Sequence, residues 1–114
     1  MSSYPLRIVF EFLDVNLVGV DVHIYLEDIS EAGAPSKIVA ERSFANVSIP
    51  CSESVYLANL DVPSFGRGAQ ISVRVHVDTS RSGTTTVGDY LSTSVCPIPE
   101  PVPAEGIDVH VHRI

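Results

Sequence analysis

The sequence predicts an all-β fold, and three features of its 114 residues indicate this. The hydrophobic residues make up 45% of the chain and are mainly Val, Ile and Leu, with no Trp, which favours strands over helices. Several segments alternate apolar and polar residues with a period of two. Turns rich in Gly, Pro, Ser and Thr separate these segments. We therefore expect a single domain over residues 1–114, a seven-stranded antiparallel two-sheet β-sandwich that is immunoglobulin-like in general architecture.

Three strands are predicted in the first half of the chain. The first, LRIVFEF at residues 6–12, has the inward side chains Leu6, Ile8, Phe10 and Phe12. The second, VDVHIYLEDIS at residues 20–30, alternates most clearly and directs inward Val20, Val22, Ile24 and Leu26. After the turn EAGAPSK comes IVAERSF at residues 38–44, in which one face is shared by Ile38, Ala40 and Phe44.

Four more strands are predicted after Pro50. They are SVYLANLDV at 54–62, AQISVRVHVD at 69–78, VGDYLSTSV at 87–95 and IDVHVHRI at 107–114. The proline-rich CPIPEPVP at 96–103 cannot enter a central ladder, so it is predicted to cross from one sheet to the other. The predicted core contains Val22, Ile24, Leu26, Ile71, Val73, Val75, Val109 and Val111.

Charge and the chain start limit the partners and the location. Seven basic and fourteen acidic residues give a formal charge of −7, which repels phosphate backbones and anionic lipids, so nucleic acid is not an expected partner. No apolar stretch is long enough to span a bilayer, and MSSYPLRIVFEF lacks the features of a signal peptide. We expect a cytoplasmic protein with Cys51 and Cys96 reduced. A signal sequence upstream would instead place it in the periplasm or at the outer membrane.

The sequence contains no catalytic signature. Ser, His and Asp are plentiful, but none occurs in a nucleophile-elbow setting such as G-x-S-x-G. The acidic residues near the first predicted turns do not reproduce a calcium-loop spacing. We therefore expect neither an enzyme nor a protein with a cofactor.

The histidines are the residues most suited to a metal ion. His110 and His112 lie two positions apart on a predicted strand, so both project from one face, about 7 Å apart, a spacing that suits zinc or copper if a third ligand approaches. His23 or His76, also predicted to face outward, could supply that ligand. Outward histidines are usually solvated polar residues, so we expect no bound ion. A metal-binding domain is the alternative reading.

The order of segments resembles a known family. VDVHIYLEDISEAGAPSKIVAERSF, SIPCSESVYL, ISVRVHVD and VGDYLSTSVCPI are similar to the YbaY and YscW type of domain, found in bacterial lipoproteins and secretion pilotins. The pattern L-x-D-[VI]-S is present as Leu26, Asp28, Ile29 and Ser30. The resemblance implies a β-sandwich without catalysis, and pilotin-like members bind a peptide segment of a secretin subunit.

That resemblance predicts a non-enzymatic protein-binding or assembly module. A sandwich has open strand edges, so a partner peptide or a second copy could dock on an edge or on a sheet face. A homodimer through a strand edge is one form of this prediction.

Overall fold

The computed structural model describes residues 2–30, 33, 37–62, 70–92, 96–98 and 105–114. Within them, strands occur in all seven segments predicted to form them. They are β1 (Ser2–Phe10), β2 (Leu17–Asp28), β3 (Lys37–Ile49), β4 (Val55–Val62), β5 (Ile71–Asp78), β6 (Tyr90–Leu91) and β7 (Ile107–Arg113). The all-β prediction is therefore confirmed.

The seven strands form one mixed sheet in the order β3-β2-β5-β6-β7-β1-β4. Most neighbours are antiparallel, but β1 and β7 run parallel, with Leu6 opposite Ile107 and Phe10 opposite Val111. The predicted two-sheet antiparallel sandwich of immunoglobulin-like architecture is wrong. The short strand β6 pairs with both β5 and β7, and this joins the two halves into one sheet.

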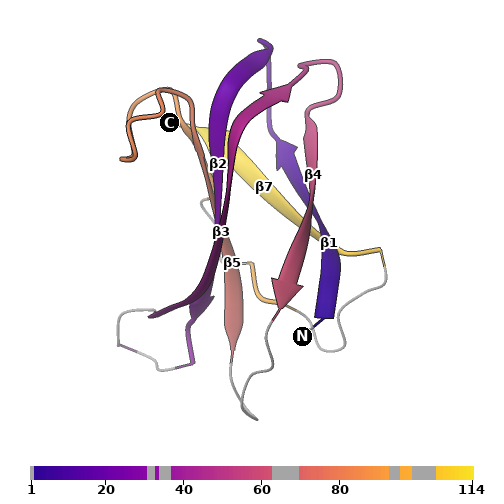
Figure 1. Ribbon diagram of the computed structural model, residues 1–114, viewed down its shortest axis with the longest axis vertical. Helices are drawn as coiled ribbons and strands as arrows, with labels where there is room; N and C mark the ends of the chain where they lie inside the picture. The colour runs from indigo at the N-terminus through magenta and orange to yellow at the C-terminus, as the bar shows by residue number, and fades with distance from the viewer. Residues whose placement is uncertain (1, 31–32, 34–36, 63–69, 93–95, 99–104) are drawn as a thin grey trace.

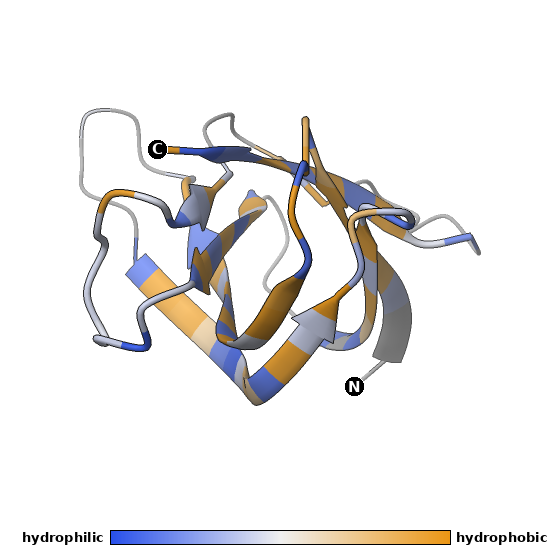
Figure 2. Ribbon diagram, turned by 90° about the horizontal axis from the view of Figure 1, so that it is seen from above, coloured by the Kyte–Doolittle hydropathy of each residue, from blue (hydrophilic) through white to orange (hydrophobic). Residues whose placement is uncertain are grey.

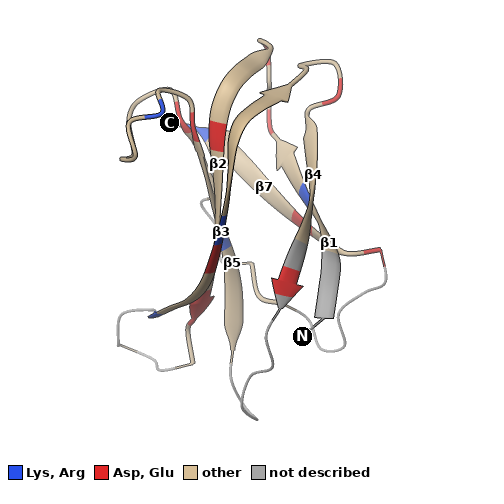
Figure 3. Ribbon diagram, in the orientation of Figure 1, with Lys and Arg blue, Asp and Glu red and all other residues tan. Residues whose placement is uncertain are grey.

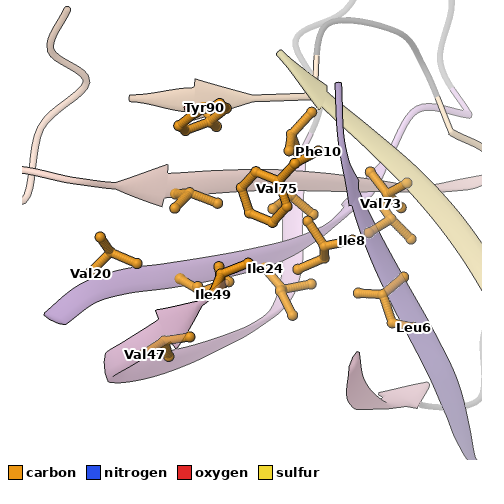
Figure 4. Packing of buried hydrophobic residues seen from close by; sticks show 14 of the residues in the cluster. Leu6, Ile8, Phe10, Val20, Ile24, Val47, Ile49, Val73, Val75 and Tyr90 are labelled. Carbon is orange, nitrogen blue, oxygen red and sulfur yellow. The ribbon is translucent and has the colours of Figure 1, made fainter. Parts of the chain in front are cut away.

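The sheet curls until it is almost a barrel, and its interior is the hydrophobic core (Figures 1 and 2). Figure 4 shows Ile8, Ile24 and Val75 converging there from three different strands. All eight predicted core residues are buried, in company with others such as Phe10 and Tyr90, whose rings meet edge to face at 5.2 Å. An aromatic pair of this kind adds about 1 kcal/mol to the burial of apolar area.

Two predicted inward side chains point elsewhere. Phe12 lies beyond the end of β1 in a turn, with φ at 57° and 95% of its surface exposed. Ile38 is also exposed, because the ladder between β2 and β3 shifts register between Leu26 and Glu27. A shift of one residue moves a side chain to the other face.

Strand β5 is buried on both faces except at Arg74. Its inward residues include Val75, but His76, predicted to face solvent, is only 5% exposed. The segment after β6 runs back beside β5, where Ser72 and Pro97 form a bridge and the Val73 amide donates to the Cys96 carbonyl at 2.9 Å. The predicted crossing between two sheets is therefore wrong as far as residues 96–98; residues 99–103 of that segment lie outside the described part.

Candidate functional site

The two terminal strands of the sheet, β3 and β4, face each other where the barrel nearly closes. They are consecutive in the chain and joined by residues 50–54, so they run in opposite directions. Within the described residues no ladder pairs them. Figure 1 shows them close together near this connection and diverging toward their other ends. We call this place the β3–β4 seam and define it by Ala40, Arg42, Phe44, Tyr56, Ala58, Asn59 and Asp61.

The register places five seam residues on the interior side of the sheet. On β3, Ala40, Arg42 and Phe44 lie opposite buried residues of β2. On β4, Tyr56 and Ala58 lie opposite buried residues of β1. The four apolar ones among them are only partly buried and pack against the core. At the seam, part of the hydrophobic core is therefore accessible from the protein surface.

Side chains hold the seam together in place of a backbone ladder. The rings of Phe44 and Tyr56 meet edge to face with centroids 6.0 Å apart. The guanidinium carbon of Arg42 lies 4.9 Å from the centre of the Phe44 ring. Arg42 Nη1 donates to the Asn59 carbonyl at 3.0 Å and lies 3.7 Å from Asp61 Oδ2. Exposed ion pairs of this length contribute about 0–1 kcal/mol, so the closure is weak.

Sequence reasoning missed the seam because it depends on which strands are terminal. The only signal was Arg42, a charged residue at an inward position of a predicted strand between Ala40 and Phe44. A cation at such a position indicates that the interior is not sealed there.

A second cluster of functional side chains is buried at the end of β5. His76, Asp78 and Asp89 are at most 5% exposed, and their nearest ligand atoms all lie within 4.8 Å of one another. Such a trio could hold a metal ion. Its carboxylate oxygens accept hydrogen bonds from the loop at residues 79–88, so the cluster anchors that loop.

Asp89 is the centre of this cluster. Its Oδ2 accepts from His76 Nε2 at 2.8 Å and from the Thr86 amide, while its Oδ1 accepts from the amide and hydroxyl of Thr79. Burial raises the pKa of Asp89, but these hydrogen bonds outweigh it and lower the pKa from 3.8 to about 2. The carboxylate therefore stays ionised and anchors both ends of the loop at residues 79–88 by hydrogen bonds.

Asp78 fastens the middle of the same loop. Its two oxygens accept hydrogen bonds from the amides of Ser82 and Gly83 and from the hydroxyl of Ser80. Burial and the nearby Asp89 raise the pKa of Asp78, but the hydrogen bonds prevail and the pKa is lowered. Sequence analysis did not predict these roles, because the contacts depend on the fold of the loop.

The four histidines do not converge on one point. His23 lies directly opposite His76 across β2 and β5, with ring centroids 5.6 Å apart, and its Nδ1 is 2.8 Å from Ser43 Oγ. His112 lies opposite Leu91, so strand β6 separates it from His76. His110 Nδ1 is 2.7 Å from Glu11 Oε1. His110 and His112 are exposed, as predicted.

The two cysteines are free thiols in the structure. Cys96 Sγ lies 3.6 Å from the Asp108 carbonyl, and burial, followed by the Asp108 charge, raises the pKa of its thiol. A thiol with a raised pKa is a poor nucleophile at neutral pH.

One solved structure resembles the whole chain. A structure described as an alternative pilotin from the type II secretion system of Vibrio cholerae matches with a TM-score of 0.71 and 17% sequence identity, over 99% of this chain and 96% of that one. The fold is similar to that of a pilotin. No protein-family model and no curated protein matches the sequence. The described residues include no helix that could cross a membrane.

Proposed function

We propose that this chain is a non-enzymatic protein-binding module that takes up a peptide segment of a secretion-system subunit at the β3–β4 seam. The observation that carries the proposal is the seam itself, where, within the described residues, two strand edges meet without a ladder and part of the core is only partly buried. Open edges of this kind bind other chains. The similarity of fold to a pilotin of a type II secretion system supports the same class of partner.

The test is binding to the secretin subunit of a secretion system from the organism that carries this gene. Tagged protein should retain that subunit in a pull-down. Calorimetry should show saturable binding and give its dissociation constant. Arg42→Gln should tighten binding, because it removes the side chain that bridges the seam and that an entering peptide has to displace. Arg7→Gln is the matched control, since Arg7 makes an exposed pair with Asp108 at 3.4 Å away from the seam.

Failure to retain the secretin, or an equal effect of both substitutions on its affinity, would contradict the proposal. A second copy of this chain would compete for the same two edges. Static light scattering over a range of concentrations would detect it as a rise in mass. A dimer whose affinity changes in Arg42→Gln and not in Arg7→Gln would place self-association at the seam.

A further inference from the structure

We propose that the partner segment enters the β3–β4 seam as an extended eighth strand, with apolar side chains pointing inward and basic side chains pointing outward. This inference rests on the proposed function and specifies the form of its partner. The juxtaposition that carries it is a pair of strand edges, without a ladder partner in the described part of the chain, that face each other across interior-facing alanines. Carboxylates lie on the outer side of the sheet at the same place.

The backbone supports an extended partner. Each residue of β3 and β4 has an amide and a carbonyl, and in a strand alternate residues direct these groups to opposite sides. β3 pairs on one side with β2, and β4 pairs on one side with β1. The groups on their other sides face the seam, where the one interaction described with the main chain is that of Arg42 with the Asn59 carbonyl. An incoming strand would supply the ladder that is missing there.

The interior side chains indicate what should point inward. Phe44 and Tyr56 already close one end of the seam with their rings. Farther along, the interior side of the seam has Arg42 and then Ala40 on β3 and Ala58 on β4. The two alanines lie opposite the buried residues Leu26 and Leu6. Alanine is a small side chain, and both alanines are only partly buried. Apolar side chains of a partner strand would cover this surface, each gaining about 1.5–3 kcal/mol when fully buried.

The outward charges indicate what should face solvent. Glu41 and Asp61 are exposed and lie on the outer side of the sheet, one on each strand of the seam. Figure 3 shows acidic residues on both strands where they diverge. The formal charge of −7 adds attraction for a cation. Entry of the strand would displace Arg42 from Asp61 and leave that carboxylate to a lysine or arginine of the partner.

The probe is an acetylated and amidated peptide of about seven residues in which lysine and valine alternate, long enough for one strand. Its control has the same composition with the valines contiguous. We expect saturable binding of the alternating peptide, about tenfold tighter than the control. Hydrogen exchange of backbone amides should slow within 37–49 and 55–62, and amides of β7 should not change.

A pair of substitutions locates the peptide. Ala40→Phe should fill the interior side of the seam and reduce peptide binding at least about tenfold. Ala45→Phe, the same change at an exposed position of the same strand, should leave it intact. Circular dichroism and thermal melting verify that each variant folds. If Ala40→Phe fails to fold, Ala58→Phe tests the same position from β4.

Equal binding of the two peptides, equal binding by the two variants, or amide protection outside β3 and β4 would each overturn the inference. If the secretin binds but its segment is helical when bound, or the alternating peptide does not bind at all, strand insertion fails while the proposed function stands. If the secretin does not bind and the alternating peptide does, the proposed function fails and the seam remains a strand acceptor.

Discussion

At the scale of single residues, Asp89 contributes more to the stability of the fold than the sequence around it suggests. It is fully buried, and four hydrogen bonds hold its carboxylate. In Asp89→Asn an NH2 group replaces one of the two acceptor oxygens. The buried donors that faced that oxygen therefore lose their hydrogen-bond partner. We expect a loss of about 2–3 kcal/mol in the free energy of unfolding, measured by urea denaturation at pH 7. Ser52→Ala, at an exposed position, is the control, and a loss below about 0.5 kcal/mol for Asp89→Asn would contradict this role.

The pH dependence of stability follows from the same carboxylate. The pKa of Asp89 is about 2 in the folded protein and close to 3.8 when unfolded. Because the pKa of Asp89 is lowered in the folded protein, its carboxylate contributes fully to the free energy of unfolding above pH 3.8. This contribution is lost as the pH falls toward 2. The expected contribution is about 2 kcal/mol.

Urea denaturation between pH 5 and pH 2 measures this effect. The stability of the wild type should fall more steeply over that range than that of Asp89→Asn. Asp78 and Asp28, whose pKa values are also lowered, contribute the slope that remains in the variant. Parallel curves for the two proteins would contradict the assignment.

Whether the burial of a side chain could be predicted from the sequence depended on what determines that burial. Val22, Ile24 and Val75 were predicted correctly, because alternation within one strand is enough to define its inner face. Phe12 and His76 were not. Phe12 follows the end of β1, and its left-handed backbone turns the side chain outward. His76 lies on the outer face of β5, but Asp89, thirteen residues along the chain, binds it there.

At the scale of elements, the position of β7 beside β1 depends on one glycine. Gly106 precedes β7 with φ at 96°, and a Cβ added to it would overlap the backbone of Pro5 in β1. Gly106→Ala should therefore push the start of β7 away from β1. We expect about 2–4 kcal/mol of destabilisation, from both strain and overlap, measured by thermal or urea unfolding.

Gly83→Ala separates these two causes. Gly83 also has a positive φ, at 81°, but an added Cβ would meet no atom within 4 Å. This variant should lose only about 1 kcal/mol, the cost of the backbone conformation. Equal losses for the two variants would show that close approach to Pro5 has no effect.

Strand pairing was the part of the fold that the sequence did not reveal. The existence of all seven strands was predicted because period and turn chemistry are local, although β6 is two residues long where nine were predicted and β3 continues to Ile49. The neighbours of a strand are decided by contacts across the whole chain, such as Leu6 with Ile107. Proline at 97 also suggested a segment outside any ladder, yet Pro97 forms a bridge with Ser72 beside β5.

At the scale of the whole molecule, one curled sheet replaces the predicted pair of packed sheets, and this change creates the candidate site. A sandwich has edges on two sheets, whereas here the two terminal strands among the described residues, β3 and β4, face each other. No residue pattern within either strand predicts that meeting. The seam could therefore be found only after the strand order was known, although its chemistry was visible in Arg42 and its apolar neighbours.

The β3–β4 seam is where we expect the molecule to open. Arg42 makes one hydrogen bond and one long ion pair across the seam, and its side chain is 44% exposed, so Arg42→Ala should cost less than about 1 kcal/mol of global stability. Locally the effect should be larger, because no ladder within the described residues holds β3 to β4. Hydrogen exchange should become faster in residues 37–43 and 57–61 and remain unchanged in β5.

Arg7→Ala is the matched control for this experiment. Arg7 is 49% exposed and pairs with Asp108 across β1 and β7, where a backbone ladder already joins the strands. Loss of the Arg7 side chain should change the global stability by less than about 1 kcal/mol. It should leave hydrogen exchange at the seam unchanged. If exchange at the seam is equally slow in both variants, packing of Phe44 against Tyr56 closes the barrel without help from Arg42, and a partner strand would have to separate those rings to enter.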